Sequence, residues 1–366
     1  MIYLDNAATT LRKPPQVSAA VLEALRSCAN PGRGGHAAAA RAEETVYRTR
    51  KLASEFFGLE PEQVCFTANA TEGLNIALCT LVRPGDRVVL SGLEHNAVTR
   101  TLTGLGAKLV PVTAPIFDAD RWAEAFAAAL SAGVSCCVCL HASNVFGALL
   151  PVDQIGALCA ERRIPFVVDA SQSAGLLPVT PERWQAAFTA MPGHKGLLGP
   201  QGTGILLCRE QPLPLRFGGT GSLSMDQKMP RELPDCLEAG TLNVPGIAGL
   251  GAALGWLRLQ NRAELLKREN KLLHAVLRLR ALGAELWTGP DQIGVLSFRL
   301  PNRDPEETAA RYARAGVALR AGLHCAPLAH RTGGTLPEGT VRLSLSVLTE
   351  PKEIERFLSV TKGLLK

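Results

Sequence analysis

Between residues 64 and 208, the sequence alternates short runs of β-forming residues with stretches of helical character. The β-rich runs are residues 64–68, 86–91, 107–112, 134–142, 164–170 and 203–208. Helical stretches are expected from Thr71, from His95, near 118–131 and near 152–163. This alternation predicts an α/β fold with a mostly parallel sheet and helices on both of its faces. The continuous apolar character of the strands fits a sheet that is buried on both sides.

The rest of the chain has a different character. Residues 210–245 are rich in Gly and Pro, which predicts a long irregular segment of the kind that often carries function. A long helical run is expected from about 247 to 280, and the strands and helices that follow it predict a smaller α+β domain. We therefore expect a large domain over 15–246 and a small domain formed by 1–14 and 247–366.

The composition narrows the class of protein. With 46% hydrophobic and 20% charged residues, the chain is typical of a globular protein with a large core. Its net charge of +6 is a mild excess without a basic run, so we expect no direct nucleic-acid binding. No apolar stretch approaches the length of a membrane span, and the N-terminus does not resemble a signal peptide. The ten cysteines are dispersed, mostly in apolar runs, which fits buried thiols in a cytoplasmic protein.

Two candidate binding residues lie where predicted strands end. Thr71 begins a helix after a small-residue turn, where free N–H groups and a hydroxyl favour an anion. The alternative is that Thr71 only caps the helix. Asp169 ends an apolar strand, at the edge where parallel sheets bind ligands. A buried carboxylate there needs a partner such as a protonated pyridine nitrogen, unless Asp169 simply caps the next turn.

Lys195 lies among glycines between two β-like runs. Glycines let the backbone approach a ligand closely, and a lysine in such a pocket can lose its proton and become a nucleophile that condenses with a carbonyl group. One rival interpretation is a phosphate-binding Gly-rich loop, but Gly196 breaks the Walker pattern, which needs Ser or Thr after the lysine. An ordinary surface lysine is the other alternative.

Cys325 differs from the other nine cysteines because it lies in a polar loop flanked by glycine. Arg320, His324 and His330 are close in sequence, and positive charge on them would favour a reactive thiolate. A chance loop cysteine is the alternative.

Two groups of cysteine and histidine could suggest a metal site. A Cys–His pair at 324–325 has no second half at zinc spacing. Cys137, Cys139 and His141 share one face of a predicted strand, but a buried strand with small, soft side chains is the better interpretation. We therefore expect no metal.

Taken together, these segments resemble the cysteine desulfurases of the class V aminotransferase family, whose members depend on pyridoxal 5'-phosphate (PLP). The resemblance rests on nine ordered blocks and extends from Tyr3 to the last helix. The blocks are NPGRGGH (30–36), ANATEGLN (68–75), LEHNA (93–97), SNVFG (143–147), VDASQSAG (168–175), GHKGLLGPQGTG (193–204), EAGTLN (238–243), GLHCAP (322–327) and VRLSLS (341–346). The resemblance implies PLP-dependent transferase fold type I with a seven-stranded type of sheet. The loop around Cys325 is similar to the short catalytic loop of the branch related to selenocysteine lyases.

The resemblance also implies a role for individual residues. Lys195 would hold PLP, Asp169 would pair with its ring nitrogen, Gln172 would bond its ring hydroxyl, and His95 would stack on the ring and assist proton transfer. The phosphate would be held by Ala70, Thr71, His194 and, from the neighbouring subunit of a homodimer, Thr241. Asn144 would lie near both the substrate and the ring oxygen, and Arg342 would clamp the substrate carboxylate.

The implied reaction converts L-cysteine to L-alanine. Lys195 would abstract the α-proton, and the Cys325 thiolate would attack the substrate sulfur to leave a persulfide. A sulfur-acceptor protein would then take that sulfur, for example in iron–sulfur cluster assembly, a sulfur relay or tRNA modification. The alternatives are a selenocysteine lyase, another PLP-dependent C–S lyase or aminotransferase of this fold, or a sulfur carrier without catalysis.

Three positions depart from the family pattern. Pro192 replaces a hydroxyl residue that would bond the phosphate, and Thr189 is a neighbour that could compensate for it. Gln201 replaces a common lysine, which we interpret as neutral. Ser346 replaces an expected glycine after the Arg342 strand.

Overall fold

The computed structural model describes residues 1–32 and 34–365, so Arg33 of the 30–36 block lies outside the described residues. Its centre is a seven-stranded sheet of order β2-β8-β7-β6-β5-β3-β4. The strands are β2 (Val64–Thr67), β3 (Arg87–Ser91), β4 (Lys108–Val112), β5 (Val134–Leu140), β6 (Phe166–Asp169), β7 (Phe188–Pro192) and β8 (Gly204–Cys208). Strand β8 runs antiparallel to both of its neighbours, and the other pairings are parallel. The predicted mostly parallel α/β sheet is thus confirmed.

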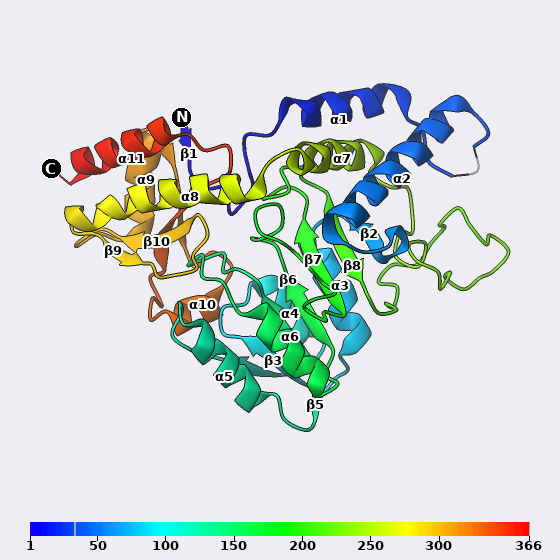
Figure 1. Cartoon of the computed structure of the whole chain (residues 1–366), viewed down its shortest axis with the longest axis horizontal. Helices are drawn as coiled ribbons and strands as arrows, with labels where there is room; N and C mark the ends of the chain where they lie inside the picture. Colours follow the sequence, from blue (N-terminus) through cyan, green and yellow to red (C-terminus); the bar gives the residue numbers. More distant parts are fainter. Residues whose placement is uncertain (33, 366) are drawn as a thin grey trace.

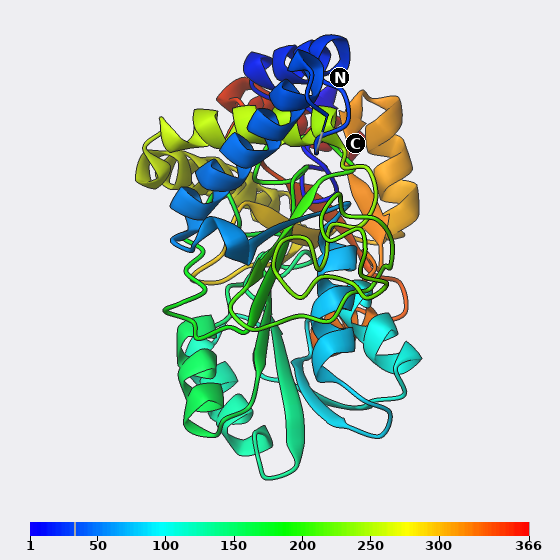
Figure 2. The ribbon, with the colours of Figure 1, turned by 90° about the vertical axis from the view of Figure 1, so that its right-hand side faces the viewer.

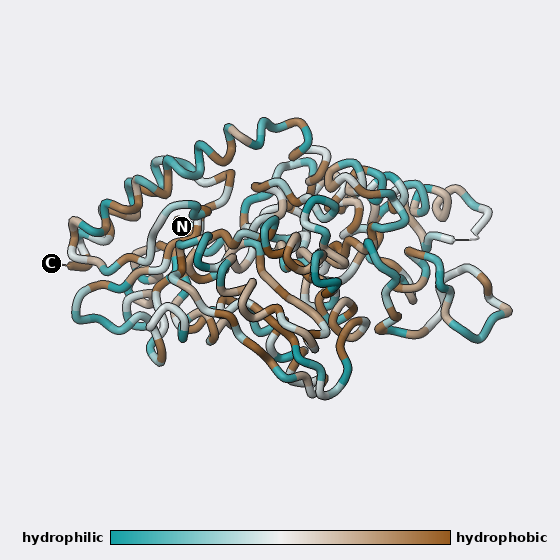
Figure 3. Tube along the Cα trace, turned by 60° about the horizontal axis from the view of Figure 1, so that its bottom comes forward, coloured by the Kyte–Doolittle hydropathy of each residue, from teal (hydrophilic) through white to brown (hydrophobic). Residues whose placement is uncertain are grey.

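Helices cover both faces of this sheet, as Figure 2 shows. Helices α3 (Ala70–Leu81) and α4 (Asn96–Gly104) pack on one face. Helices α5 (Ala119–Ala129) and α6 (Val152–Glu161) pack on the other. The inner strands are buried along nearly their whole length, which explains their continuous apolar sequence. Apolar residues accordingly run through the middle of the molecule in Figure 3.

A helical layer formed by α1 (Pro15–Ser27), α2 (Ala37–Phe57) and α7 (Val244–Arg258) adjoins the sheet (Figure 1). The single helical run expected over 247–280 is wrong. Helix α7 ends at Arg258, and α8 (Arg262–Val276) begins after Asn261, whose side chain caps it by accepting the Glu264 N–H. The expected domain boundary at 246 therefore falls inside α7.

The C-terminal part contains a four-stranded antiparallel sheet of order β12-β13-β10-β9. Its strands are β9 (Glu285–Trp287), β10 (Val295–Arg299), β12 (Arg320–Gly322) and β13 (Thr340–Ser344). The helices of this part are α8, α9 (Pro305–Arg314), α10 (Pro327–Thr332) and α11 (Pro351–Leu364), together with the short 3-10 helix η2 (Leu277–Leu282) that follows α8. A second 3-10 helix, η1 (Pro61–Gln63), precedes β2. Strand β1 (Ile2–Tyr3) pairs with β11 (Val317–Ala318), which attaches the N-terminus here as expected.

Between β8 and α7 the described chain forms neither helix nor strand, which confirms the long irregular segment. A buried ion pair anchors its end: Arg50 Nη1 and Nη2 lie 2.8 and 2.7 Å from the two carboxylate oxygens of Glu238. Glu238 also accepts the Phe66 N–H, so it ties the segment to α2 and β2. No helix in the described ranges is long and apolar enough to span a membrane.

Candidate active site

A cavity of about 220 Å³ lies at the carboxyl ends of β5 and β6 and at the start of α3. Eight of the residues predicted from the sequence line it: Ala70, Thr71, His95, Asn144, Asp169, Gln172, His194 and Lys195. The sheet brings them together because the carboxyl ends of its parallel strands meet at one edge. Cys325, Arg342 and Thr241 do not line this cavity.

Asp169 supplies the carboxylate of the cavity. It ends β6, is only 5% exposed, and stands in register with Leu140 of β5. Its Oδ1 accepts the Ser171 N–H at 2.9 Å, so the predicted turn cap is also present. One oxygen therefore fixes the turn, and the carboxylate also lines the cavity.

Lys195 lies in the turn that follows β7 and lines the cavity, so the alternative of an ordinary surface lysine is wrong. Burial lowers the pKa of its ammonium group to about 8, although the negative charge of Asp169 acts in the opposite direction. Two glycines shape the turn, because a Cβ at Gly193 would clash with Thr203 and a Cβ at Gly196 would clash with the Ala174 carbonyl. A lysine with this pKa carries a substantial neutral fraction near pH 8 and can act as a nucleophile or a base.

His95 joins the cavity from the start of α4. Its Nδ1 accepts the Ala97 N–H at 3.0 Å, which caps the helix and fixes the ring. Burial lowers the pKa of His95, while Asp169 raises it and Lys195 lowers it. The imidazole is therefore neutral at neutral pH, with Nε2 as its N–H donor.

The start of α3 provides an anion site. Asn69, not Thr71, caps this helix by accepting the Glu72 N–H at 2.9 Å, so the interpretation of Thr71 as the cap is wrong. The N–H groups of Ala70 and Thr71, the first two of the helix, are left for a ligand. Beside them, His194 Nδ1 is buried without a partner in the described chain. Burial, Lys195 and Lys13 lower the pKa of His194 to about 4, so its ring is neutral.

Cys325 lies on an exposed loop beside the helix start that carries His95. Its carbonyl oxygen accepts the Asn96 N–H at 2.7 Å. His324 and Cys325 both adopt left-handed φ angles, of 51° and 56°, which non-glycine residues rarely do and which often mark functional loops. All ten cysteines are free, and Cys325 is the exposed one among them, as the sequence predicted.

The histidines near Cys325 do not supply positive charge, so that part of the sequence interpretation is wrong. Burial, assisted by Arg342, lowers the pKa of His324 to about 2. Burial, assisted by Arg299, lowers the pKa of His330 to about 4. The permanent cations near the thiol are Arg320 and Arg342.

Arg342 is 2% exposed and is already engaged inside the protein. Its Nη1 donates to the Asn144 carbonyl at 2.9 Å and its Nη2 to Asp5 Oδ1 at 2.9 Å. Its buried Nε has no partner within the described chain. Asn144 in turn donates from Nδ2 to the His324 carbonyl at 2.8 Å, while its Oδ1 is unpartnered.

Pro192, which stands where the family carries a hydroxyl residue, lines the cavity. Thr189 does not line it, so Thr189 cannot replace the missing hydroxyl.

The described residues contain no group of three or more His, Cys, Asp or Glu arranged to hold a metal ion. Cys137 and Cys139 are wholly buried in the core, and the His141 ring packs against Trp184 in a T-shaped arrangement.

Comparison with known proteins agrees with this geometry. The family model for aminotransferase class-V matches residues 2–357. The chain belongs to the aminotransferase class-V family. A probable cysteine desulfurase from Pyrococcus abyssi is 31% identical, with 100% of this chain and 94% of the relative covered. A cysteine desulfurase from Escherichia coli is 30% identical, with 98% and 92% covered. The apo structure of a cysteine desulfurase from Thermococcus onnurineus has a TM-score of 0.90 at 31% identity, with 100% and 94% covered.

This class-V site contains one residue that the sequence analysis did not single out. Glu94 precedes His95 and is fully buried. Its Oε1 accepts the Ser91 hydroxyl at 2.5 Å and the Leu140 N–H at 2.7 Å, while Oε2 has no partner in the described chain. It thus joins the end of β3 to the end of β5, next to Asp169. Its position directly before His95, shortly after the apolar run 88–90, was the available signal.

Glu94 makes stability depend on pH. Burial raises its pKa to about 8, and Asp169 adds to the shift while the Ser91 bond opposes it. Its unfolded pKa lies near 4.3, so the stabilisation from the neutral folded form is present at low pH and is lost as pH rises from about 5 to about 8.

As the pH rises over this range, we expect the free energy of unfolding of Glu94→Gln to fall less than that of the wild type. The difference should grow by up to about 1.4 kcal/mol per pH unit, measured by urea unfolding. Glu124→Gln, which removes an exposed carboxylate, is the control and should follow the wild type. Parallel pH curves for Glu94→Gln and the wild type would contradict the assignment.

Proposed function

We propose that this protein is a PLP-dependent cysteine desulfurase that converts L-cysteine to L-alanine and transfers the sulfur to Cys325. The observation that carries the proposal is the exposed thiol of Cys325 next to the cavity of Lys195 and Asp169. The thiol lies on a loop with left-handed φ angles, and the backbone of this loop is hydrogen-bonded to the start of the helix that carries His95. The relatives named above are cysteine desulfurases, which gives this chemistry a precedent in the family.

The cavity fits PLP in its donor set. Lys195 would hold the cofactor covalently, and Asp169 would face its ring nitrogen. The start of α3 at Ala70 and Thr71, together with the unpartnered His194 Nδ1, suits the phosphate. Gln172 would reach the ring hydroxyl, although its Nε2 already donates to the Ala7 carbonyl at 3.1 Å. Bound PLP would withdraw electrons from the substrate, which acidifies the α-hydrogen and weakens the C–S bond.

The protein's own groups would then move protons and sulfur. Lys195, with its pKa near 8, accepts the α-proton and returns a proton to the product. The neutral His95 would cover the ring and would exchange a proton at Nε2. The Cys325 thiolate attacks the substrate sulfur, so that an S–S bond forms as the C–S bond breaks, and the electron pair of that bond remains with the carbon that becomes the methyl group of alanine.

Substrate binding would use Arg342 and Asn144. The unpartnered Arg342 Nε and Asn144 Oδ1 are buried polar atoms that the folded chain leaves unsatisfied. A substrate carboxylate would satisfy the first and an amine or ring hydroxyl the second.

A homodimer would complete the site. Thr241 is exposed and lies in a separate cavity with Arg216 and Glu238, at the end of the irregular segment. That segment also exposes large apolar side chains, including Phe217 at 79% and Met225 at 96%. A partner subunit would cover these side chains and receive Thr241 at its own phosphate site.

The free state of all ten cysteines suits a reducing compartment, so we place the protein in the cytoplasm. A selenocysteine lyase is the second candidate, because the short loop around Cys325 resembles that branch. The exposed thiol is a feature that only the desulfurase reaction requires. An acceptor protein would collect the persulfide, and iron–sulfur cluster assembly is one use for that sulfur.

Cys325→Ser separates the two candidates. We expect this variant to keep the cofactor absorbance and to lose sulfide and alanine formation from L-cysteine, because no thiol remains to attack the sulfur. Alanine release from L-selenocysteine would persist if the protein is a lyase. Cys79→Ser, at a half-buried position in α3, is the control. Unchanged alanine formation from L-cysteine in Cys325→Ser would overturn the proposed sulfur transfer.

Thr241→Ala should weaken PLP binding by about 10- to 100-fold, because a hydrogen bond to a charged group contributes about 1.5–3 kcal/mol. Equilibrium PLP titration measures this change, and Thr220→Ala in the same segment is the control. In a mixed dimer of Thr241→Ala and Lys195→Ala subunits, the single lysine site receives an intact Thr241 from its partner. Normal affinity there is expected, and weak affinity would show that Thr241 acts within its own subunit.

A further inference from the structure

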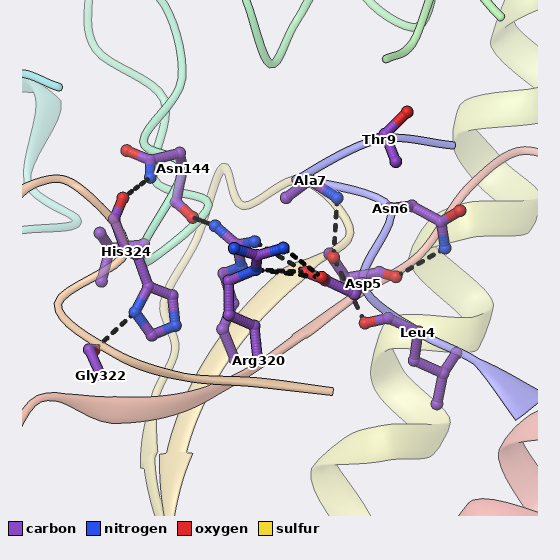
Figure 4. Close-up of polar contacts among 12 residues, drawn as sticks. Leu4, Asp5, Asn6, Ala7, Thr9, Asn144, Arg320, Gly322 and His324 are labelled. Atoms are coloured by element: carbon purple, nitrogen blue, oxygen red, sulfur yellow. Dashed lines mark hydrogen bonds and ion pairs between the residues drawn. The ribbon is translucent and has the colours of Figure 1, made fainter. Parts of the chain in front are cut away.

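Asp5 lies between two arginines in the cluster of Figure 4. Its carboxylate is 2.9 Å from Arg342 Nη2 through Oδ1 and 3.0 Å from both Nε and Nη2 of Arg320 through Oδ2. Asp5 and Arg342 are buried, whereas the Arg320 side chain is half exposed. One carboxylate therefore holds both guanidinium groups that lie near Cys325.

The charges of this cluster sum to one unit of positive charge. Two guanidinium groups face one carboxylate, and His324 beside them is neutral because burial lowers its pKa to about 2. His330 behind it is neutral as well. On the cavity side, Lys195 and Asp169 oppose each other. The cluster thus offers a single uncompensated cation to a ligand.

The backbone fixes Asp5 independently of the arginines. Asp5 forms a bridge with Ser344 of β13, and the Ala7 N–H donates to Ser344 Oγ at 2.8 Å. A few residues further on, the Thr10 N–H donates to the His194 carbonyl at 3.0 Å. The segment that carries Asp5 is therefore tied at one end to the strand of Arg342 and at the other to the turn of Lys195.

We propose that Asp5 is a positioning residue that aligns Arg342 and cancels the charge of Arg320, so that the site selects amino acids with one carboxylate over those with two. This inference rests on the proposed function, because it assigns charge selectivity to the same substrate site. An amino acid such as cysteine brings one carboxylate and matches one cation. A second carboxylate would find no second free cation and would have to lose its hydration without compensation.

The test uses the PLP-loaded protein and two probes, L-alanine and L-aspartate, whose dissociation constants are measured from the change in the cofactor absorbance. The wild type should prefer L-alanine. Asp5→Asn leaves two cations, and the preference should shift toward L-aspartate by about tenfold, which corresponds to about 1.4 kcal/mol of electrostatic free energy.

The decisive variant is Asp5→Asn combined with Arg320→Gln, which restores one net positive charge. We expect it to recover the wild-type preference for L-alanine, whereas a merely structural role of Asp5 predicts no recovery. Arg320→Gln alone leaves no net charge and should weaken the binding of both amino acids. If Asp5→Asn does not fold, Arg320→Gln still tests the charge balance. Glu353→Gln, which removes another buried carboxylate bonded to an arginine, is the control.

The outcomes separate the two proposals. An alanine-to-aspartate ratio that is unchanged in Asp5→Asn, or a double variant that stays shifted, overturns the role of Asp5 and leaves the desulfurase proposal intact. A wild type whose cofactor absorbance responds to neither amino acid overturns the proposed function itself, and the inference falls with it.

Discussion

The placement of a lysine and a buried carboxylate in one cavity, at the ends of adjacent parallel strands, is the constraint that the rest of the structure serves. Asp169 ends β6 and Lys195 follows β7, and these two strands are hydrogen-bonded in the parallel part of the sheet. Burial favours the neutral amine while the carboxylate favours the ammonium ion, so the pKa of Lys195 settles near 8. The apolar strands, the glycines of the turn and the capped starts of α3 and α4 all contribute to holding these two groups at one edge.

The N-terminal segment connects this edge to the C-terminal sheet. Its first residues pair with β11 and reach Ser344, and its threonines bond the backbone of the Lys195 turn. Arg320 and Arg342 therefore lie in the C-terminal sheet and Lys195 follows a strand of the central sheet, but the same short connector contacts all three. Through these contacts, a few N-terminal residues influence the site although they are distant from it in sequence.

The parts of the fold that could be predicted are those in which local pattern and burial agree. The strands from 64 to 208 have continuous apolar sequence because both sheet faces are covered, and eight predicted residues meet because strand ends converge. The break between α7 and α8 was missed because Leu259 and Gln260 do not interrupt a helical pattern, and only the cap at Asn261 marks it. The charge of His324 and the partner of Arg342 depend on burial and on Asp5, which is distant in sequence, so local reasoning could not find them.

The most direct test of this account is the location of the cofactor bond. The protein is loaded with PLP, reduced with borohydride, digested and analysed by mass spectrometry. The account predicts a stable cofactor adduct on Lys195 and the loss of both adduct and absorbance in Lys195→Ala. An adduct on another lysine, or an unmodified Lys195 peptide in protein saturated with PLP, would contradict it.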